Sequence, residues 1–173
     1  MKKDNWIPKA FLMTFFIALI FSSASNYLIS KFNNSILLIV ICVLFILIGI
    51  IFDIIGTSVL TGNEATFHAK SSKKIKGSKE GVYLIKNANR ISSICNDVIG
   101  DICGIVSGSL GAMLAINIST KLNLSIVLTT LLISSIISSL TVGGKAIGKK
   151  YAINNSDNII FITAKILNKF KKM

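Results

Sequence analysis

The sequence is poor in acidic residues and in the residues that build most catalytic and metal centres. Of its 173 residues only seven are Asp or Glu, one is His and one is Pro, whereas 52% are hydrophobic. A soluble domain needs a more highly charged surface, so the composition indicates an integral membrane protein. The sequence also contains no Walker A motif, nucleophile elbow, zinc-ligand spacing or dinucleotide-binding fingerprint. We therefore expect no enzymatic activity.

Cysteine is scarce as well, and its three copies form no motif. Cys42, Cys95 and Cys103 lie in apolar segments, and none belongs to a CxxC pair. An odd number of cysteines inside predicted helices argues against a disulfide framework. We expect all three to be small buried side chains.

Long apolar runs are abundant. A helix needs about 20 mostly apolar residues to cross a membrane, and four segments meet this requirement: residues 10–30, 36–60, 93–118 and 122–143. The first follows two lysines, as a cleaved signal peptide would, but we expect it to be retained because the charge distribution is then consistent. The predicted fold class is all-α, a polytopic membrane protein with about four transmembrane helices.

The 19 basic residues are distributed unevenly among the connections. In chain order, the N-terminus holds three, the first short loop one, the long loop seven, the next loop one and the tail seven. This alternation is the positive-inside pattern, which predicts a multi-pass protein of the cell (inner) membrane with both termini cytoplasmic. This topology is the first explanation of the net charge of +12, and attraction to anionic lipid is an alternative one. The charge requires no nucleic-acid partner.

The chain divides by composition into three regions. They are an N-terminal region with the first transmembrane helix (1–35), a three-helix core that includes the cytoplasmic loop 62–92 (36–143), and a basic amphipathic juxtamembrane tail (144–173). We expect the loop to form two short basic helices broken at Gly77. The tail places Ile159, Ile162, Ile166 and Phe170 at helical spacing, so it is expected to lie on the inner leaflet.

Two aspartates and four glycines interrupt the third apolar run. At α-helical geometry they share one face that is roughly 100° wide, together with Ser93. The members are Asp97, Asp101, Gly100, Gly104, Gly108 and Gly111. An aspartate at mid-membrane costs about 2.5–3.5 kcal/mol on insertion scales, and spaced glycines allow close helix packing. We expect this stripe to face a polar neighbour and the opposite face, rich in Ile, Val, Leu and Met, to face lipid.

The neighbouring spans carry matching polar faces. Asp53 shares a face of the second span with three small or polar residues, Gly49, Gly56 and Thr57. The fourth span carries four hydroxyl residues on one face, Thr130, Ser134, Ser138 and Thr141. Carboxylate, amide and hydroxyl oxygens suit Mg²⁺ or Ca²⁺ rather than soft metals. The predicted metal ligands are Asp53, Ser93, Asn96, Asp97 and Asp101. The acids could equally carry protons or sodium, and the hydroxyl groups could simply bond to their own backbone.

Three stretches resemble the transmembrane domain of the cyclin M/CorC (CorB) magnesium transporters. "IFDIIGTSVLT" (51–61) resembles the family's phenylalanine-rich segment, and "KNANRISSI" (86–94) resembles its Asn-Pro-x-Arg turn, with Ala88 in place of proline. "GGKAIGKKYAINNSDNIIFITAKILNKF" (143–170) resembles the stretch that leads into its juxtamembrane helix. The resemblance covers residues 45–170 and implies magnesium transport by a homodimer.

The chain departs from this family at the positions of the family's ligands. Here it has Asp53 and Ile55 in place of serines, Gly56 and Thr141 in place of glutamates, and Gly144 in place of a proline. Only Ser93 matches like for like. We also expect no regulatory CBS pair and no C-terminal cytoplasmic domain.

The predicted function is an integral membrane protein that binds and transports a divalent cation, Mg²⁺ first, through an acid-lined helix bundle. Its expected partners are the lipid bilayer, the cation and a second copy of the chain. The alternative is a non-transporting scaffold or subunit that docks another helix through its Gly/Asp stripe. A holin-like lysis protein is a third possibility.

Overall fold

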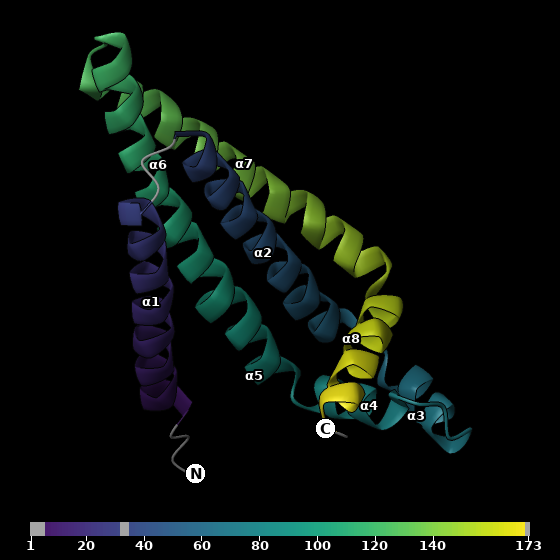
Figure 1. The fold of residues 1–173 in the computed structure, drawn as a ribbon. Helices are drawn as coiled ribbons and strands as arrows, with labels where there is room; N and C mark the ends of the chain where they lie inside the picture. Colours follow the sequence, from purple (N-terminus) through teal and green to yellow (C-terminus); the bar gives the residue numbers. More distant parts are fainter. Residues whose placement is uncertain (1–5, 32–34, 172–173) are drawn as a thin grey trace. The chain divides into compact units, whose positions relative to one another are not determined.

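The computed structural model describes residues 6–31 and 35–171, and every regular element in this part of the chain is a helix. This confirms the predicted all-α fold class (Figure 1). In chain order the helices are α1 (Trp6–Lys31), α2 (Ser35–Thr61), α3 (Glu64–Ser72), α4 (Ser78–Lys86), α5 (Ala88–Ser93), the π-helical η1 (Ile94–Gly100), α6 (Asp101–Leu122), α7 (Ile126–Asn154) and α8 (Ser156–Lys171).

Four helical stretches are long and apolar enough to cross a membrane, as predicted. They are Trp6–Tyr27 within α1, the whole of α2, the stretch Ala88–Leu122 formed by α5, η1 and α6, and the whole of α7. The fourth is longer than expected, because α7 continues through Gly143 and Gly144 to Asn154. A Cβ on Gly144 would collide with the side chain of Ile50. This close packing compensates for the low helix propensity of glycine.

The chain forms two compact units, each built from two segments that are distant in sequence. Unit 1 comprises residues 1–50 and 98–144, and unit 2 comprises residues 51–97 and 145–173. The boundaries fall inside α2, η1 and α7. The three regions predicted from composition are continuous segments, so the units cut across them.

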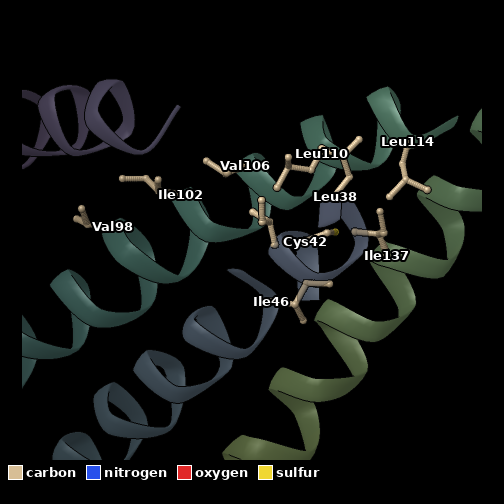
Figure 2. Close-up of a cluster of buried hydrophobic side chains, with 10 residues drawn as sticks. Leu38, Cys42, Ile46, Val98, Ile102, Val106, Leu110, Leu114 and Ile137 are labelled. Carbon is tan, nitrogen blue, oxygen red and sulfur yellow. The ribbon is translucent and has the colours of Figure 1, made fainter. Parts of the chain in front are cut away.

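Unit 1 is held together by apolar side chains of α2 and α6, with Val98 from η1 and Ile137 from α7 (Figure 2). Helix α1 packs against α6 and adds half-buried side chains such as Phe21. Ile102, Val106 and Leu110 of α6 are at most 2% exposed. They lie on the face that was expected to meet lipid, so this expectation was wrong: they form the core of the unit.

Unit 2 is built on α4, which packs against α3 and α8. Its core joins Phe67, Leu84, Ile160 and Ala164 to Val59 at the end of α2. Phe67 is fully buried, and this central role was not predicted. The ring of Phe67 lies against α4 at Gly81, where an added Cβ would collide with it.

The basic loop confirms the prediction of two short helices broken at Gly77. Helix α3 ends at Ser72 and α4 begins at Ser78. Gly77 has a φ of +89°, a left-handed conformation that costs glycine little because it has no Cβ. The backbone N–H of Asn63, just before α3, donates a hydrogen bond of 3.0 Å to Oδ1 of Asp157 in the first turn of α8. This bond fixes the start of α8 to the start of the loop.

The three cysteines are free and buried, as predicted. The thiol of Cys42 lies 3.5 Å from the carbonyl oxygen of Ser107 and donates a weak hydrogen bond to it. Because no disulfide joins them, all three thiols become reactive only when the helices separate, and this makes them internal reporters of unfolding.

Candidate functional site

Asp53 is a buried carboxylate in the part of α2 that belongs to unit 2. Its side chain is 3% exposed, and Nζ of Lys149 in α7 lies 3.8 Å from its Oδ2. This distance is within the range of an ion pair but is longer than a hydrogen bond. The Lys149 side chain is 52% exposed, whereas the carboxylate that it approaches is buried. Charge attraction thus connects α2 and α7 within unit 2.

The third span does not keep α-helical geometry through the predicted site. Residues Ile94–Gly100 form the π-helical segment η1, which carries both Asn96 and Asp97. A π-helical turn contains more residues than an α-helical turn, and such turns are frequent at functional sites. The predicted stripe assumed 100° per residue throughout, so its angles do not hold across η1.

Asn96 presents its amide oxygen to α2. Its Nδ2 donates a hydrogen bond of 3.2 Å to Oγ of Ser92. Its Oδ1 lies against Gly56, where an added Cβ would collide with it. Among the described residues this buried oxygen has no hydrogen-bond partner. An unsatisfied buried acceptor costs about 1–3 kcal/mol, which a bound water or cation would recover.

Two of the five predicted ligands involve the same stretch of α2 in unit 2. Gly56 follows Asp53 by three residues, so the two occupy neighbouring turns on the same side of α2. The amide oxygen of Asn96 thus packs on α2 about one turn from Asp53, whose carboxylate lies near Nζ of Lys149 in α7. Both are hard oxygen ligands of the kind that Mg²⁺ and Ca²⁺ prefer.

Of the other three predicted ligands, Ser93 and Asp97 bond to each other, and Asp101 belongs to the other unit. Oγ of Ser93 donates a hydrogen bond of 2.7 Å to Oδ2 of Asp97, and Asp97 is exposed. Asp101 begins α6, is also exposed and belongs to unit 1. Within residues 6–31 and 35–171, no three His, Cys, Asp or Glu side chains are grouped so that they could hold a metal ion.

The four glycines expected to pack helices divide into two groups. A Cβ on Gly111 would collide with Ile137 of α7, and the carbonyl oxygen of Gly100 would lie 3.4 Å from a Cβ on Gly49. A Cβ on Gly104 or Gly108 would meet no described atom within 4 Å. Gly100 and Gly111 therefore take part in contacts within unit 1, whereas Gly104 and Gly108 leave one side of α6 open.

The hydroxyl groups of the fourth span bond to their own helix. Oγ of Ser134 donates to the carbonyl oxygen of Leu131 at 3.2 Å, and Oγ1 of Thr141 donates to that of Ile137 at 2.8 Å. These are the local bonds that Ser and Thr commonly make inside helices. They give no sign that this face lines a site.

Lys149 is the neighbour of Asp53 that the sequence did not reveal. It was counted only as one of seven basic residues of the tail. It follows Ser138 by eleven residues, about three turns, so it extends the polar face of the fourth span. This spacing places Lys149 on the same helix face as Ser138 only because α7 continues beyond residue 143.

Comparison with known proteins finds no match: no protein-family model, curated protein or solved structure is similar to this chain. The resemblance to the cyclin M/CorC domain therefore stays a prediction based on three sequence stretches.

Proposed function

We propose that this protein binds a divalent cation, Mg²⁺ first, within the membrane and carries it across as a homodimer. The observation that supports this most is the burial of two hard oxygen ligands, the carboxylate of Asp53 and the amide oxygen of Asn96, which packs on α2 about one turn from Asp53. Mg²⁺ usually keeps several waters and is held by one or two protein carboxylates, so two protein oxygens suffice. The charge pattern favours the inner membrane with both termini cytoplasmic.

Lys149 acts in this proposal as an exchangeable counter-charge. Opposite charges 3.8 Å apart attract by about 4 kcal/mol at an effective dielectric constant near 20, and exposure of the lysine lowers this value. A cation that reaches Asp53 displaces the ammonium group into water. The carboxylate then keeps a positive neighbour with and without the ion, and the lysine limits how tightly the ion binds.

The exposed acids have an outer role in the same proposal. Asp97, held by Ser93, and Asp101 attract cations towards the third span without entering the innermost shell. A weak outer site of this kind is screened by salt, whereas the buried site is screened much less. Substitution of Asp97 or Asp101 should therefore weaken Mg²⁺ binding mainly at low ionic strength.

The experiment measures stabilisation of the purified full chain by Mg²⁺. Asp53→Asn should abolish the Mg²⁺-dependent rise in melting temperature. Lys149→Gln should lower the Mg²⁺ concentration at half effect by about tenfold, since removal of a partly screened competitor is worth roughly 1–2 kcal/mol. Lys150→Gln makes the same charge change at a neighbouring position and is the matched control.

Two results would contradict the cation proposal. One is a wild-type protein whose melting is unaffected by millimolar Mg²⁺. The other is an Asp53→Asn variant that responds to Mg²⁺ like the wild type. A Lys149→Gln variant that is destabilised but gains no affinity for Mg²⁺ would make the Asp53–Lys149 pair purely structural.

A second candidate function is a scaffold that docks another helix, and the open side of α6 favours it. Within the described chain, no atom packs closely enough on Gly104 or Gly108 to require a glycine there. Small residues four apart allow another helix to approach closely. Gly104→Leu should then release a co-purifying chain or separate two copies, while Asp53→Asn should not.

A further inference from the structure

A basic hollow lies in unit 2 between the α3–α4 connection and the last turns of α8. It has a volume of about 340 Å³ and is lined by Lys76, Gly77, Lys165, Asn168 and Lys169. It contains three lysines and no acid, and none of the three ammonium groups forms an ion pair with another described residue. The neighbouring surface of the connection adds Lys74 and Lys79, with Glu80 beside them.

The fold holds these lysines together. Gly77 packs so closely on α8 that an added Cβ would lie 3.2 Å from the backbone nitrogen of Lys165. Nζ of Lys165 lies 4.3 Å from the ring centroid of Phe161, and Nζ of Lys70 lies 4.8 Å from the same centroid. Like charges that are held near one another repel, so an anion in the hollow would relieve this repulsion.

Helix α8 carries an unpartnered apolar row beside the hollow. Ile160 and Ala164 pack into the core of unit 2, whereas Ile162, Ile166 and Phe170 are 59%, 53% and 71% exposed. The spacing of four places these three side chains on one face of the helix.

The lysines of the hollow lie at the edge of that apolar row. Lys165 and Lys169 directly precede Ile166 and Phe170 in the sequence, and at α-helical geometry they lie between the apolar row and the packed face. Lysines in this position can bury their stems along apolar surface and keep the ammonium groups at a polar boundary. Helix α8 therefore has a packed side, a basic edge and an exposed apolar row, as expected at a membrane interface.

We propose that the hollow binds the phosphate headgroup of an anionic phospholipid while the row Ile162, Ile166 and Phe170 enters the acyl boundary of the same leaflet. The lysines match the phosphate in charge, and the apolar row gives a reason for a lipid rather than a soluble anion. A basic residue near an anionic membrane surface strengthens binding by about fivefold. The proposal concerns unit 2 alone and does not depend on cation binding at Asp53.

The test compares two lipids that differ only in headgroup charge. The detergent-purified full chain is melted with increasing phosphatidylglycerol or with phosphatidylcholine of the same acyl chains. Phosphatidylglycerol should raise the melting temperature of the wild type and phosphatidylcholine should not. The combined variant Lys76→Gln, Lys165→Gln and Lys169→Gln should require about a hundredfold more phosphatidylglycerol for the same effect.

The matched control removes three lysines outside the hollow. Lys9→Gln, Lys73→Gln and Lys150→Gln together make the same change in net charge, and their requirement for phosphatidylglycerol should stay within a few-fold of the wild type. If the combined hollow variant does not fold, Lys169→Gln alone should require about fivefold more lipid. Equal losses in the hollow variant and the control would overturn the proposal, because binding would then follow net charge alone.

Two further measurements separate a lipid from a soluble anion. Inorganic phosphate or pyrophosphate in place of lipid should not stabilise the wild type, and stabilisation equal to that by phosphatidylglycerol would overturn the proposal. Phe170→Trp in a Trp6→Phe background should be quenched by phosphatidylglycerol with brominated acyl chains. Absence of quenching would show that the row of α8 does not reach the lipid, and would also overturn the proposal.

Discussion

Replacement of Gly56 by alanine tests the packing that places Asn96 beside α2. A Cβ at residue 56 would collide with the amide of Asn96 and would lie 3.0 Å from Cβ of Cys95. Overpacking of this kind costs about 1–3 kcal/mol, whereas alanine gains about 1 kcal/mol of helix propensity over glycine. The net effect should be a loss of stability of up to about 2 kcal/mol.

Gly104→Ala is the matched control, because a Cβ there would meet no described atom within 4 Å. It makes the same chemical change inside a helix and should keep the gain of about 1 kcal/mol. The two variants should therefore differ by about 1–3 kcal/mol, or roughly 2–12 °C in melting temperature for a chain of this size. A thiol-reactive fluorescent dye, which labels the three buried cysteines as they become exposed, measures both transitions. Equal melting temperatures for Gly56→Ala and Gly104→Ala would contradict the close contact between Asn96 and α2.

Three further substitutions test the packing of unit 2. Phe67→Ala should destabilise the protein by about 3–5 kcal/mol, because Phe67 is fully buried; a change below 1 kcal/mol in denaturant unfolding would contradict its place in the core. Gly77→Ala should cost about 1–2 kcal/mol through its φ of +89°, and Gly77→Asn, measured in the same melts, should cost less. Asp157→Ala removes the acceptor of the Asn63 N–H, so hydrogen exchange at Asn63 should accelerate while exchange in α6 stays unchanged.

Hydropathy and turn chemistry were enough to predict much of the fold. The four spans follow from long apolar runs, and the break at Gly77 follows from a glycine between two basic helical stretches. These features depend on short-range composition, which a sequence displays directly. The end of the fourth span was misplaced because Gly144 packs against Ile50, a contact between residues far apart in the chain.

The orientation of the third span was less predictable. A face of Ile102, Val106 and Leu110 is equally suited to lipid and to another helix, because lipid tails are as apolar as these side chains. Hydrophobicity therefore could not show that this face is buried. The π-helical segment has no strong sequence signature, and it shifts the register between Asp97 and Asp101.

The candidate site stays a prediction, although two of its residues have buried oxygens. Asp53 and Asn96 were named from their chemistry, and the structure shows that the Asp53 side chain and the Asn96 amide oxygen are buried. Lys149 was missed because its contact with Asp53 joins positions 96 residues apart. The positive-inside rule assigned Lys149 to the cytoplasmic tail, and nothing in the sequence indicated that its side chain reaches a buried carboxylate.

The central claim is that a divalent cation crosses the membrane by way of Asp53, and flux into proteoliposomes tests it most directly. Vesicles that contain the purified chain and a Mg²⁺-sensitive dye are exposed to external Mg²⁺. The proposal predicts a protein-dependent rise in dye signal for the wild type and for Lys150→Gln, and no rise above protein-free vesicles for Asp53→Asn. Equal flux in the wild type and Asp53→Asn, or no flux in either, would contradict it.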